Sequence, residues 1–419
     1  PAAGLPDQRN DMNELIAGID LCDEYTQVSC GDEEKAWTFP TVIFRHRAAG
    51  TWSVGEDAYA QTLRGEGSLT DKLVKLVLKD GTATLDGVRY TAKELLELFL
   101  ERVLCTVKKD LETEDAFQGL VFTVRSLDER LVETLYSCGE KLGLEKKQIR
   151  VIGHSESMIY YMLSQKKEIW SGTVGMFDLS EQELRYYEMK VQRGLKKNAV
   201  LAEYETMEES FSLDILETPS GAKLGDKILC TCADRLMQRK LYSAVFLMGK
   251  GFEKREWAED FMKLLCTKRR VYMETAMFAK GAAYCAQDHL RPQTSYPYAM
   301  ICEGRLKSSV AMEVLHKGQE MTVTLAAAGD GWRDSGSMLE VIPEKQNAIE
   351  LEIMPFDSKK KKAVTLMLEG FPSRPERTTR VRVEVSFLDE KTMKVVLTDR
   401  GFGELFPATD TRIVQEVML

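Results

Sequence analysis

One short pattern occurs twice in this sequence, and it constrains the fold more than any other feature. Residues 15–28 and 173–193 each contain an apolar strand with an aspartate near its end, a short polar turn and a second strand that runs back. Apolar runs bounded by turn residues are typical of buried strands. A unit that occurs twice predicts an architecture of two similar halves.

Strands and helices alternate around both copies of this unit. The apolar segments 119–124 and 149–154 are each followed by a helical pattern, and the strand pattern 244–250 lies between helical patterns in the second half. This order predicts a parallel sheet with crossover helices. We therefore predict an α/β domain over residues 15–287.

The repeated unit also indicates where a site could lie. If the two halves face one another, Asp20 and Asp178 stand on opposite walls of one cleft. The alternative is that each aspartate only caps the end of its strand. The spacing alone favours neither interpretation.

The pattern changes after residue 287. Residues 288–296 are polar and contain proline, as linkers do, and residues 297–419 contain about six to eight short alternating runs separated by turn residues. Alternation at this spacing predicts an antiparallel β-sandwich that forms a separate domain. Residues 1–14 have no periodicity, and we interpret them as a leader or a disordered tail.

Composition and charge exclude several classes of protein. The sequence has no run of about 18 apolar residues, and no basic segment precedes an apolar stretch near its beginning. We therefore expect neither a membrane anchor nor a secretory signal, which leaves the cytoplasm as the expected location. The formal net charge is −9, which argues against nucleic acid as a partner because phosphate binding needs a basic face.

Cysteine and histidine occur without the spacing of a metal site. The nine cysteines include no Cys-x-x-Cys pair, and the four histidines show no His-x-x-x-His spacing. The pattern indicates a reducing compartment and predicts no metal ion. Cys230 and Cys232 could form a metal or redox site, but they lie in a helical pattern, where free thiols ordinarily pack in the core.

Several segments together resemble one known family. They are "IAGIDLCDEYTQV" (16–28), residues 119–163, "VGMFDLSEQELRYYEM" (174–189), residues 244–265 and 273–286, and residues 368–404 with their Pro-flanked turn and Asp-Arg-Gly ending. From about residue 15 onward the chain resembles the DnaK-type heat-shock chaperones. That resemblance implies a duplicated actin-like (ribonuclease H-like) ATPase domain followed by a β-sandwich that binds extended peptides.

The resemblance also implies a set of site residues. Asp20, Glu156 and Asp178 match catalytic positions of the family, and Lys72 is a candidate for its catalytic lysine. The positions of the family's nucleotide loops are occupied here by Asp23, Glu24, Thr26, Ser180, Glu181, Gly249 and Gly251.

The sequence departs from the family where phosphate would bind. The family has glycine and hydroxyl residues after the first aspartate, whereas this chain has Cys22, Asp23 and Glu24, and its second loop reads Ser180-Glu181-Gln182-Glu183. A carboxylate 4 Å from a phosphate charge costs about 4 kcal/mol at an effective dielectric constant near 20. Two or three such contacts would cancel a micromolar affinity of about 8 kcal/mol. We therefore expect no nucleotide cofactor, with ATP and Mg²⁺ as the alternative.

Other departures concern the rest of the family's machinery. Lys250 separates Gly249 from Gly251, Arg185 replaces an acidic residue, and only about 55 residues connect the second phosphate segment to the adenosine segment. The last residues, "FPATDTRIVQEVML", allow one or two helical turns, so we expect no helical lid and only weak, reversible capture of peptide. The retained carboxylates could bind metal or could hydrogen-bond to N–H groups at strand ends.

Three functions remain open from the sequence. The first, which we favour, is a non-catalytic chaperone-like adaptor or scaffold with a degenerate nucleotide cleft that binds a protein or peptide partner. The second is a slow or atypical Mg-ATP-dependent ATPase in which Asp20, Glu156 and Asp178 position the metal and water. The third is an actin-like filament or assembly.

Overall fold

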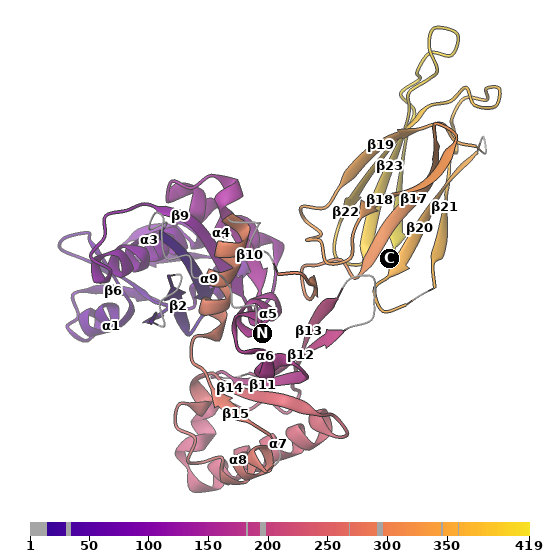
Figure 1. Ribbon diagram of the computed structural model, residues 1–419. Helices are drawn as coiled ribbons and strands as arrows, with labels where there is room; N and C mark the ends of the chain where they lie inside the picture. The colour runs from indigo at the N-terminus through magenta and orange to yellow at the C-terminus, as the bar shows by residue number, and fades with distance from the viewer. Residues whose placement is uncertain are drawn as a thin grey trace. The chain divides into compact units, whose positions relative to one another are not determined.

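The computed structural model describes residues 15–30, 35–181, 183–192, 198–267, 269–290, 296–344, 347–358 and 360–419. The predicted tail 1–14 and most of the predicted linker 288–296, namely residues 291–295, lie outside the described residues. The chain forms two compact units (Figure 1). The first comprises residues up to Tyr187 together with Glu205–Tyr296, and the second comprises Glu188–Tyr204 and Pro297–Leu419.

The first repeated unit forms the centre of a five-stranded sheet. Strand β1 pairs antiparallel with β2, as the turn at Cys22–Glu24 predicts, and parallel with β9, which in turn pairs parallel with β10. The strand order is β10-β9-β1-β2-β3. The strands are β1 (Leu15–Leu21), β2 (Tyr25–Ser29), β3 (Ala36–Pro40), β9 (Phe117–Val124) and β10 (Ile149–Gly153).

The second repeated unit lies in a sheet with the same order. The order β15-β14-β11-β12-β13 is followed by β16, and β14 pairs parallel with both β11 and β15. Strands β13 and β15 were not predicted from the sequence. The strands are β11 (Thr173–Leu179), β12 (Leu184–Gln192), β13 (Ala199–Thr206), β14 (Tyr242–Met248), β15 (Val271–Met273) and β16 (Ala299–Ile301).

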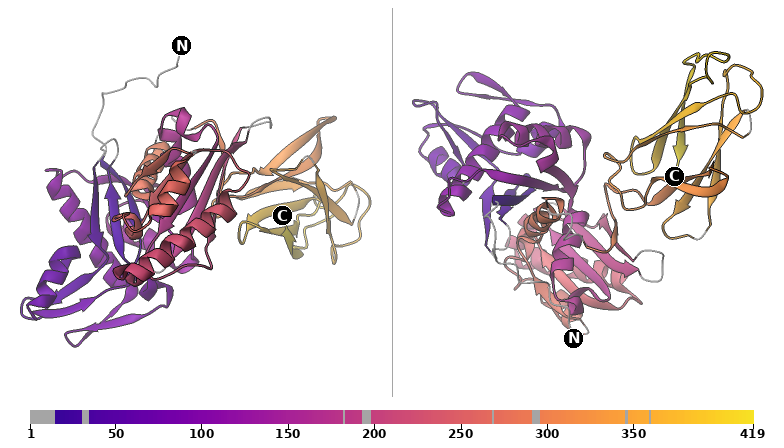
Figure 2. Two further views of the ribbon diagram at one scale, coloured as in Figure 1. Left: turned by 90° about the horizontal axis from the view of Figure 1, so that it is seen from below. Right: turned by 45° about the horizontal axis from the view of Figure 1, so that its top comes forward.

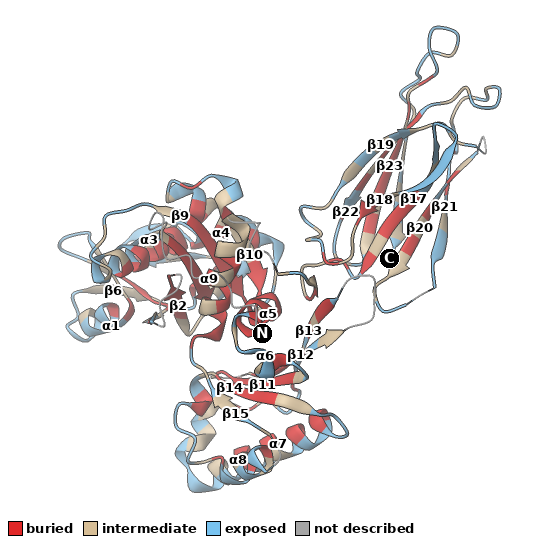
Figure 3. Ribbon diagram, viewed as in Figure 1, coloured by how far each residue is buried: buried red, intermediate tan, exposed pale blue. Residues whose placement is uncertain are grey.

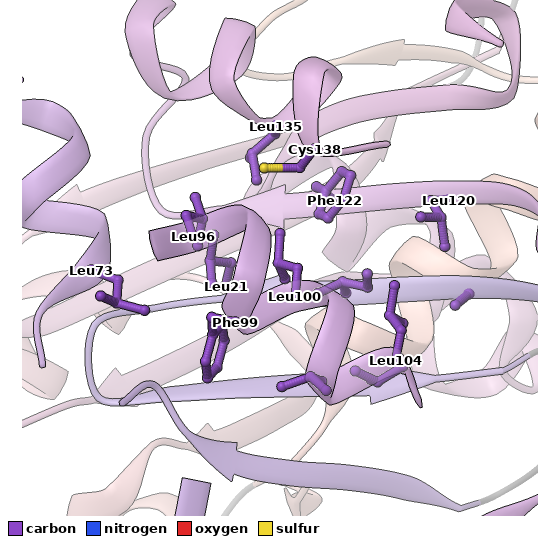
Figure 4. Packing of buried hydrophobic residues seen from close by; sticks show 14 of the residues in the cluster. Leu21, Leu73, Leu96, Phe99, Leu100, Leu104, Leu120, Phe122, Leu135 and Cys138 are labelled. Carbon is purple, nitrogen blue, oxygen red and sulfur yellow. The ribbon is translucent and has the colours of Figure 1, made fainter. Parts of the chain in front are cut away.

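Helix α3 (Ala92–Asp110) begins at a capping signal in the sequence and packs its apolar face in the core of the first half. Thr91 and Glu94 form a capping box, in which each side chain accepts a hydrogen bond from the other residue's backbone N–H. The apolar face of α3 covers the first sheet and contacts α4 (Glu129–Lys141) (Figure 4). The side chains in this core include Leu96, Phe99, Leu100 and Leu104 of α3, Leu21, Leu120 and Phe122 of the sheet, and Leu135 and Cys138 of α4.

Two helices pack closely on the site described below. Helix α5 (His154–Ser164) is buried along almost its whole length (Figure 3) and packs on α9 (Met277–Leu290). A Cβ atom added to Gly281 would overlap Ser157 of α5, so the contact needs glycine at this position. Helix α9 continues to Leu290, three residues into the predicted linker.

The remaining elements of the first unit are shorter or lie near its surface. They are α1 (Gly55–Leu63), α2 (Leu73–Leu78), α6 (Lys167–Trp170), α7 (Pro219–Met237), α8 (Glu259–Cys266), β4 (Ile43–His46), β5 (Trp52–Val54), β6 (Gly67–Thr70), β7 (Thr82–Leu85), β8 (Val88–Thr91) and the 3₁₀ turns Lys146–Gln148, Leu213–Glu217 and Lys250–Phe252.

The part of the second unit after Pro297 consists of strands and loops (Figure 2). Two four-stranded antiparallel sheets, β18-β17-β20-β21 and β19-β22-β23-β24, contribute to one apolar core. Their strands are β17 (Ser308–His316), β18 (Gln319–Ala326), β19 (Ser337–Val341), β20 (Ala348–Pro355), β21 (Lys362–Met367), β22 (Val381–Phe387), β23 (Thr392–Asp399) and β24 (Arg412–Met418).

The predicted helical turns at the end of the chain are wrong. Residues Arg412–Met418 form β24, which pairs antiparallel with β23 from Thr392 to Thr398. Burial alternates along β24 with the period of a strand. The backbone groups of this segment form hydrogen bonds with the neighbouring strand β23. The residues of the segment alone therefore do not determine that it forms a strand.

The structure confirms the coarse fold class. The chain is a mixed α/β protein with several sheets, followed by a region built only from strands. Within the described residues, no helix combines the length and the apolar character needed to cross a membrane.

Candidate functional site

The carboxyl end of β1 brings together three potential ligand side chains. Asp20 Oδ1 lies 2.8 Å from Nε2 of His154, which begins α5, and 3.7 Å from Sγ of Cys22. The exposed fractions of Asp20, Cys22 and His154 are 0%, 2% and 1%. The His154 ring stacks on Phe278 of α9 at a centroid distance of 3.8 Å. Strand β1 and helices α5 and α9 therefore hold this cluster in place.

The carboxyl end of β11 faces an arginine from the other half of the unit. Asp178 is fully buried, and its Oδ2 lies 3.3 Å from Nη2 of Arg125, which follows β9. The other terminal nitrogen of Arg125 lies 3.3 Å from Glu183 Oε2. Arg185 pairs with the same glutamate and donates a 2.6 Å hydrogen bond to the backbone oxygen of Arg125. Two arginines and two carboxylates thus form one ion-pair network.

These charges shift the ionisation of the buried groups around them. Burial alone would lower the pKa of Arg125, but the charge of Asp178 and the smaller contributions of Cys22, Tyr25 and Tyr187 together outweigh it and raise that pKa well above the ordinary value. Burial, followed by the charges of Cys22, Asp20 and Asp178, raises the pKa of Tyr25 well above its usual range. Both aspartates therefore act on the ionisation of one phenol.

Most of the predicted loop residues contact other parts of the chain. Asp23 Oδ1 accepts a 3.0 Å hydrogen bond from the backbone N–H of Lys75, near the start of α2, and Glu181 lies 2.6 Å from Lys250 Nζ. Thr26 is buried and shares a 2.9 Å hydrogen bond with Thr41. The backbone oxygen of Glu24 accepts a hydrogen bond from Thr41 N–H at 3.4 Å.

The second loop is a tight turn, and the two predicted glycines pack against it. Ser180 donates hydrogen bonds from its N–H (2.9 Å) and its hydroxyl (3.1 Å) to the backbone oxygen of Glu183. Gly249 has a φ of +89°, and a Cβ there would overlap the backbone of Leu179 and lie 2.7 Å from Asp178 Oδ1. A Cβ at Gly251 would overlap the Leu179 side chain. Both glycines therefore permit the chain to pack on itself.

The remaining two predicted residues lie apart from this network or face another partner. Glu156 is buried within α5 and forms a 3.1 Å ion pair with Arg150 of β10. Lys72 is exposed and adopts a left-handed conformation, φ 53°, immediately before α2.

The cysteine pair lies where the helical pattern places it. Cys230 and Cys232 are both in α7, and Cys232 is buried in the apolar core of the second half. Burial is the largest cause that raises the pKa of both thiols to about 11.

Sequence reasoning missed the two residues that organise the site, His154 and Arg125. His154 was included in a strand pattern, and Arg125 was not singled out. Both residues directly follow strands of the sheet that contains Asp20. Because the carboxyl ends of parallel strands meet at one edge of a sheet, polar residues just after each strand are a signal that could have located them.

Comparison with known proteins places most of the chain in one family. Residues 24–303 match the family described as "Family of unknown function (DUF5716) C-terminal". The chain belongs to the DUF5716 family. Residues 305–419 match a second model, described as "Domain of unknown function (DUF8552)".

Comparisons with curated proteins and with solved structures do not identify a further family. No curated protein matches the chain. Among solved structures, a non-polymerising mutant of MamK bound to AMPPNP is similar at 12% identity and a TM-score of 0.39, over 66% of this chain and 99% of that one.

Proposed function

We propose that this DUF5716 protein is a chaperone-like adaptor or scaffold that binds a protein or an extended peptide, and that its nucleotide cleft is degenerate. In this proposal the two mixed sheets are the halves of a duplicated actin-like ATPase fold, because both have the same strand order around a β-hairpin that carries an aspartate. The two later sheets, with their common core, form the β-sandwich.

The position of Arg125 is the observation that carries this proposal. Its guanidinium lies against Asp178 and Glu183, where the resemblance places the second phosphate loop. A cation supplied by the chain thus occupies a place where an ATPase needs Mg²⁺ and phosphate. Binding a triphosphate would separate these pairs and leave carboxylates facing phosphate, at about 4 kcal/mol for each close contact.

The loops around this network support the same conclusion. Glu181 is paired with Lys250 and Asp23 caps α2. The backbone N–H groups of Cys22 and Ser180 are bonded within their own turns, to the backbone oxygens of Tyr25 and Glu183, and so are not offered to an anion. Gly249 and Gly251 approach Leu179 closely, and their lack of a side chain serves that contact. The residues present do not fit Mg-ATP, and no catalytic step is assigned to them.

The strand β18 offers a surface for an extended partner. It is an edge strand of its sheet, and among the described residues Gln319–Thr322 are exposed. Met321 is 48% exposed and the neighbouring Leu315 of β17 is 71% exposed. A peptide that adds to such an edge gains main-chain hydrogen bonds and contacts for alternate side chains.

Calorimetry with Mg-ATP tests the nucleotide part of the proposal. We expect no saturable binding with a Kd below about 50 µM, which corresponds to about 6 kcal/mol. Tighter binding that Asp178→Asn abolishes would support the slow ATPase instead. Light scattering over a range of concentrations tests the filament alternative, which predicts species that keep growing.

Fluorescence anisotropy tests the partner-binding part. The probe is a reduced and alkylated, permanently unfolded protein that carries a fluorescent label. We expect saturable binding that weakens at least about fivefold in Met321→Glu, because a charge would face the added strand. Met367→Glu places the same charge on the edge strand β21, where Met367 is 44% exposed, and serves as the control. Equal affinities for the two variants would contradict the assignment to β18.

A further inference from the structure

Asp20, Cys22 and His154 form a cluster of metal-ligand type that the sequence spacing did not predict. One oxygen, one sulfur and one nitrogen atom of these residues all lie within 4.8 Å of one another. From the geometry of this cluster we propose that the chain holds a divalent metal ion of the zinc class at the carboxyl end of β1. The inference departs from the sequence-based prediction of no metal, and it does not rest on the proposed function.

The donor set suits zinc better than magnesium or calcium. Thiolate, imidazole and carboxylate are all ordinary Zn²⁺ ligands, whereas magnesium and calcium take oxygen ligands. Zn–S bonds of about 2.3 Å and Zn–O or Zn–N bonds of about 2.0 Å place tetrahedral ligands about 3.3 to 3.5 Å apart. The Cys22 Sγ to Asp20 Oδ1 distance is 3.7 Å and the His154 Nε2 to Asp20 Oδ1 distance is 2.8 Å. Each of these two distances lies within about half an ångström of the tetrahedral range.

An unpartnered carboxylate oxygen points to the same site. Within the described part of the chain, Asp20 Oδ2 is buried without a hydrogen-bond partner, and so is Thr123 Oγ1, which lies opposite Asp20 in the β1–β9 register. A buried carboxylate oxygen without a partner is unfavourable by at least about 1 to 3 kcal/mol. Bidentate coordination of a cation by Asp20, with Oδ1 as one ligand and Oδ2 in the fourth position, removes that penalty.

The surroundings of His154 can support metal binding. Its Nδ1 lies 3.4 Å from the hydroxyl oxygen of Tyr187, and Phe278 fixes the plane of the ring. When Nε2 binds the ion, the neutral imidazole carries its proton on Nδ1. This N–H group can then donate a hydrogen bond to the hydroxyl oxygen of Tyr187. Such outer contacts commonly orient histidine ligands. Cys22 loses its thiol proton to solvent, so loading one Zn²⁺ ion releases one proton.

The burial of the cluster determines how the ion would enter. All three ligands are at most 2% exposed, so the ion must be acquired while the chain folds and exchanges slowly afterwards. Once bound, it joins the end of β1 to the start of α5, two segments 134 residues apart in the sequence. The site is therefore structural and closed.

The test begins with the full chain expressed in medium that contains zinc and purified without chelators. Elemental analysis should give about one mole of zinc per mole of chain. The protein is then unfolded, freed of metal and refolded with Co²⁺ as the probe. A thiolate-to-cobalt charge-transfer band should appear, and Cys22→Ala and His154→Gln should reduce metal content at least about tenfold.

A control and a second measurement keep the result interpretable if a variant folds poorly. Cys138→Ala removes another buried thiol, which is 1% exposed, and should retain the metal. Refolding of the unmodified chain with a chelator should give a lower Tm than refolding with zinc. The proposal is overturned if the unmodified protein contains no stoichiometric metal and shows no cobalt band. Metal that persists in Cys22→Ala and His154→Gln also overturns it, because the ion is then bound elsewhere.

Discussion

The guanidinium of Arg125 lies 3.3 Å from the carboxylate of Asp178, which is completely buried. The two residues come from different halves of the first unit, since Arg125 directly follows β9 and Asp178 lies near the end of β11. This contact joins the two halves of the first unit. The interaction gives Asp178 a structural partner that does not depend on any ligand.

Removal of the arginine charge should destabilise the protein strongly. Arg125→Met leaves Asp178 as a buried carboxylate without a cation, and we expect a loss of about 3 to 5 kcal/mol in the free energy of unfolding. Adding Asp178→Asn should recover part of this loss, since the orphaned charge is then gone. Urea unfolding measures both. As a control, Arg130→Met at an exposed position of α4 should change the free energy of unfolding by less than about 0.5 kcal/mol. If the effects of Arg125→Met and Asp178→Asn simply add, the two residues do not interact and the pairing is contradicted.

A single methyl group at Gly18 should prevent the normal packing of β1 on α9. The new Cβ would overlap the backbones of Ala279 and Ala283, and backbone atoms of a buried helix cannot easily move aside. We expect Gly18→Ala to cost at least about 3 kcal/mol, at the upper end for overpacked cores. Thermal unfolding is the measurement. Gly172→Ala is the matched control, because its Cβ would lie 3.6 Å from Ser243, an ordinary contact.

Thiol reactivity should divide the nine cysteines into two groups. Cys105 and Cys266 are exposed, whereas the others are buried or partly buried. Burial, the largest cause, raises the pKa of Cys138 to about 12, which leaves little reactive thiolate at neutral pH. Ellman's reagent at pH 8 should therefore modify two thiols quickly and the rest only after denaturation. Replacement of both exposed cysteines by serine should abolish the fast phase, and a fast phase that survives would show an opening of the core.

Local patterns predicted the elements whose signals are short-range. The hairpin at β1 and β2 follows from an apolar run and a polar turn, and α3 follows from its Thr91–Glu94 cap and its amphipathic period. Most strands of the second unit follow from alternation and turn residues. The local sequence did not predict strand β24, because these few residues form a strand only through their pairing with β23.

Local sequence patterns predict even less of the candidate site. Its aspartates could be named from the repeat, but the partners of those aspartates could not. Arg125 precedes Asp178 by 53 residues, and His154 follows Asp20 by 134 residues. Only the order of strands in the sheet brings such residues together. Charge pairing between distant side chains leaves no period in the sequence.

Asp399 should make the second unit sensitive to acid. Its carboxylate accepts hydrogen bonds from Arg374 at 2.7 and 2.8 Å, from the N–H groups of Gly401 and Thr409 at 3.0 Å and from the Thr409 hydroxyl at 2.6 Å. Burial alone would raise the pKa of Asp399, but these hydrogen bonds outweigh it and hold the pKa well below the ordinary value. The stabilisation is therefore present above the unfolded-state pKa of about 3.9 and is lost as the pH falls from there toward the lower folded-state pKa.

Asp399→Asn tests this pH dependence. At pH 7 we expect the variant to be about 3 to 5 kcal/mol less stable, because the buried Arg374 loses its counter-charge. The difference between the two proteins should shrink as the pH falls below about 4, where Asp399 of the unfolded unmodified chain begins to be protonated while the folded chain still holds it ionised. Urea unfolding of both proteins between pH 7 and pH 3 measures it. As a control, Asp410→Asn changes a carboxylate that is 75% exposed and should leave the dependence of stability on pH unaltered. If the stability difference between Asp399→Asn and the unmodified protein stays constant from pH 7 to pH 3, Asp399 acts through its shape and not its charge.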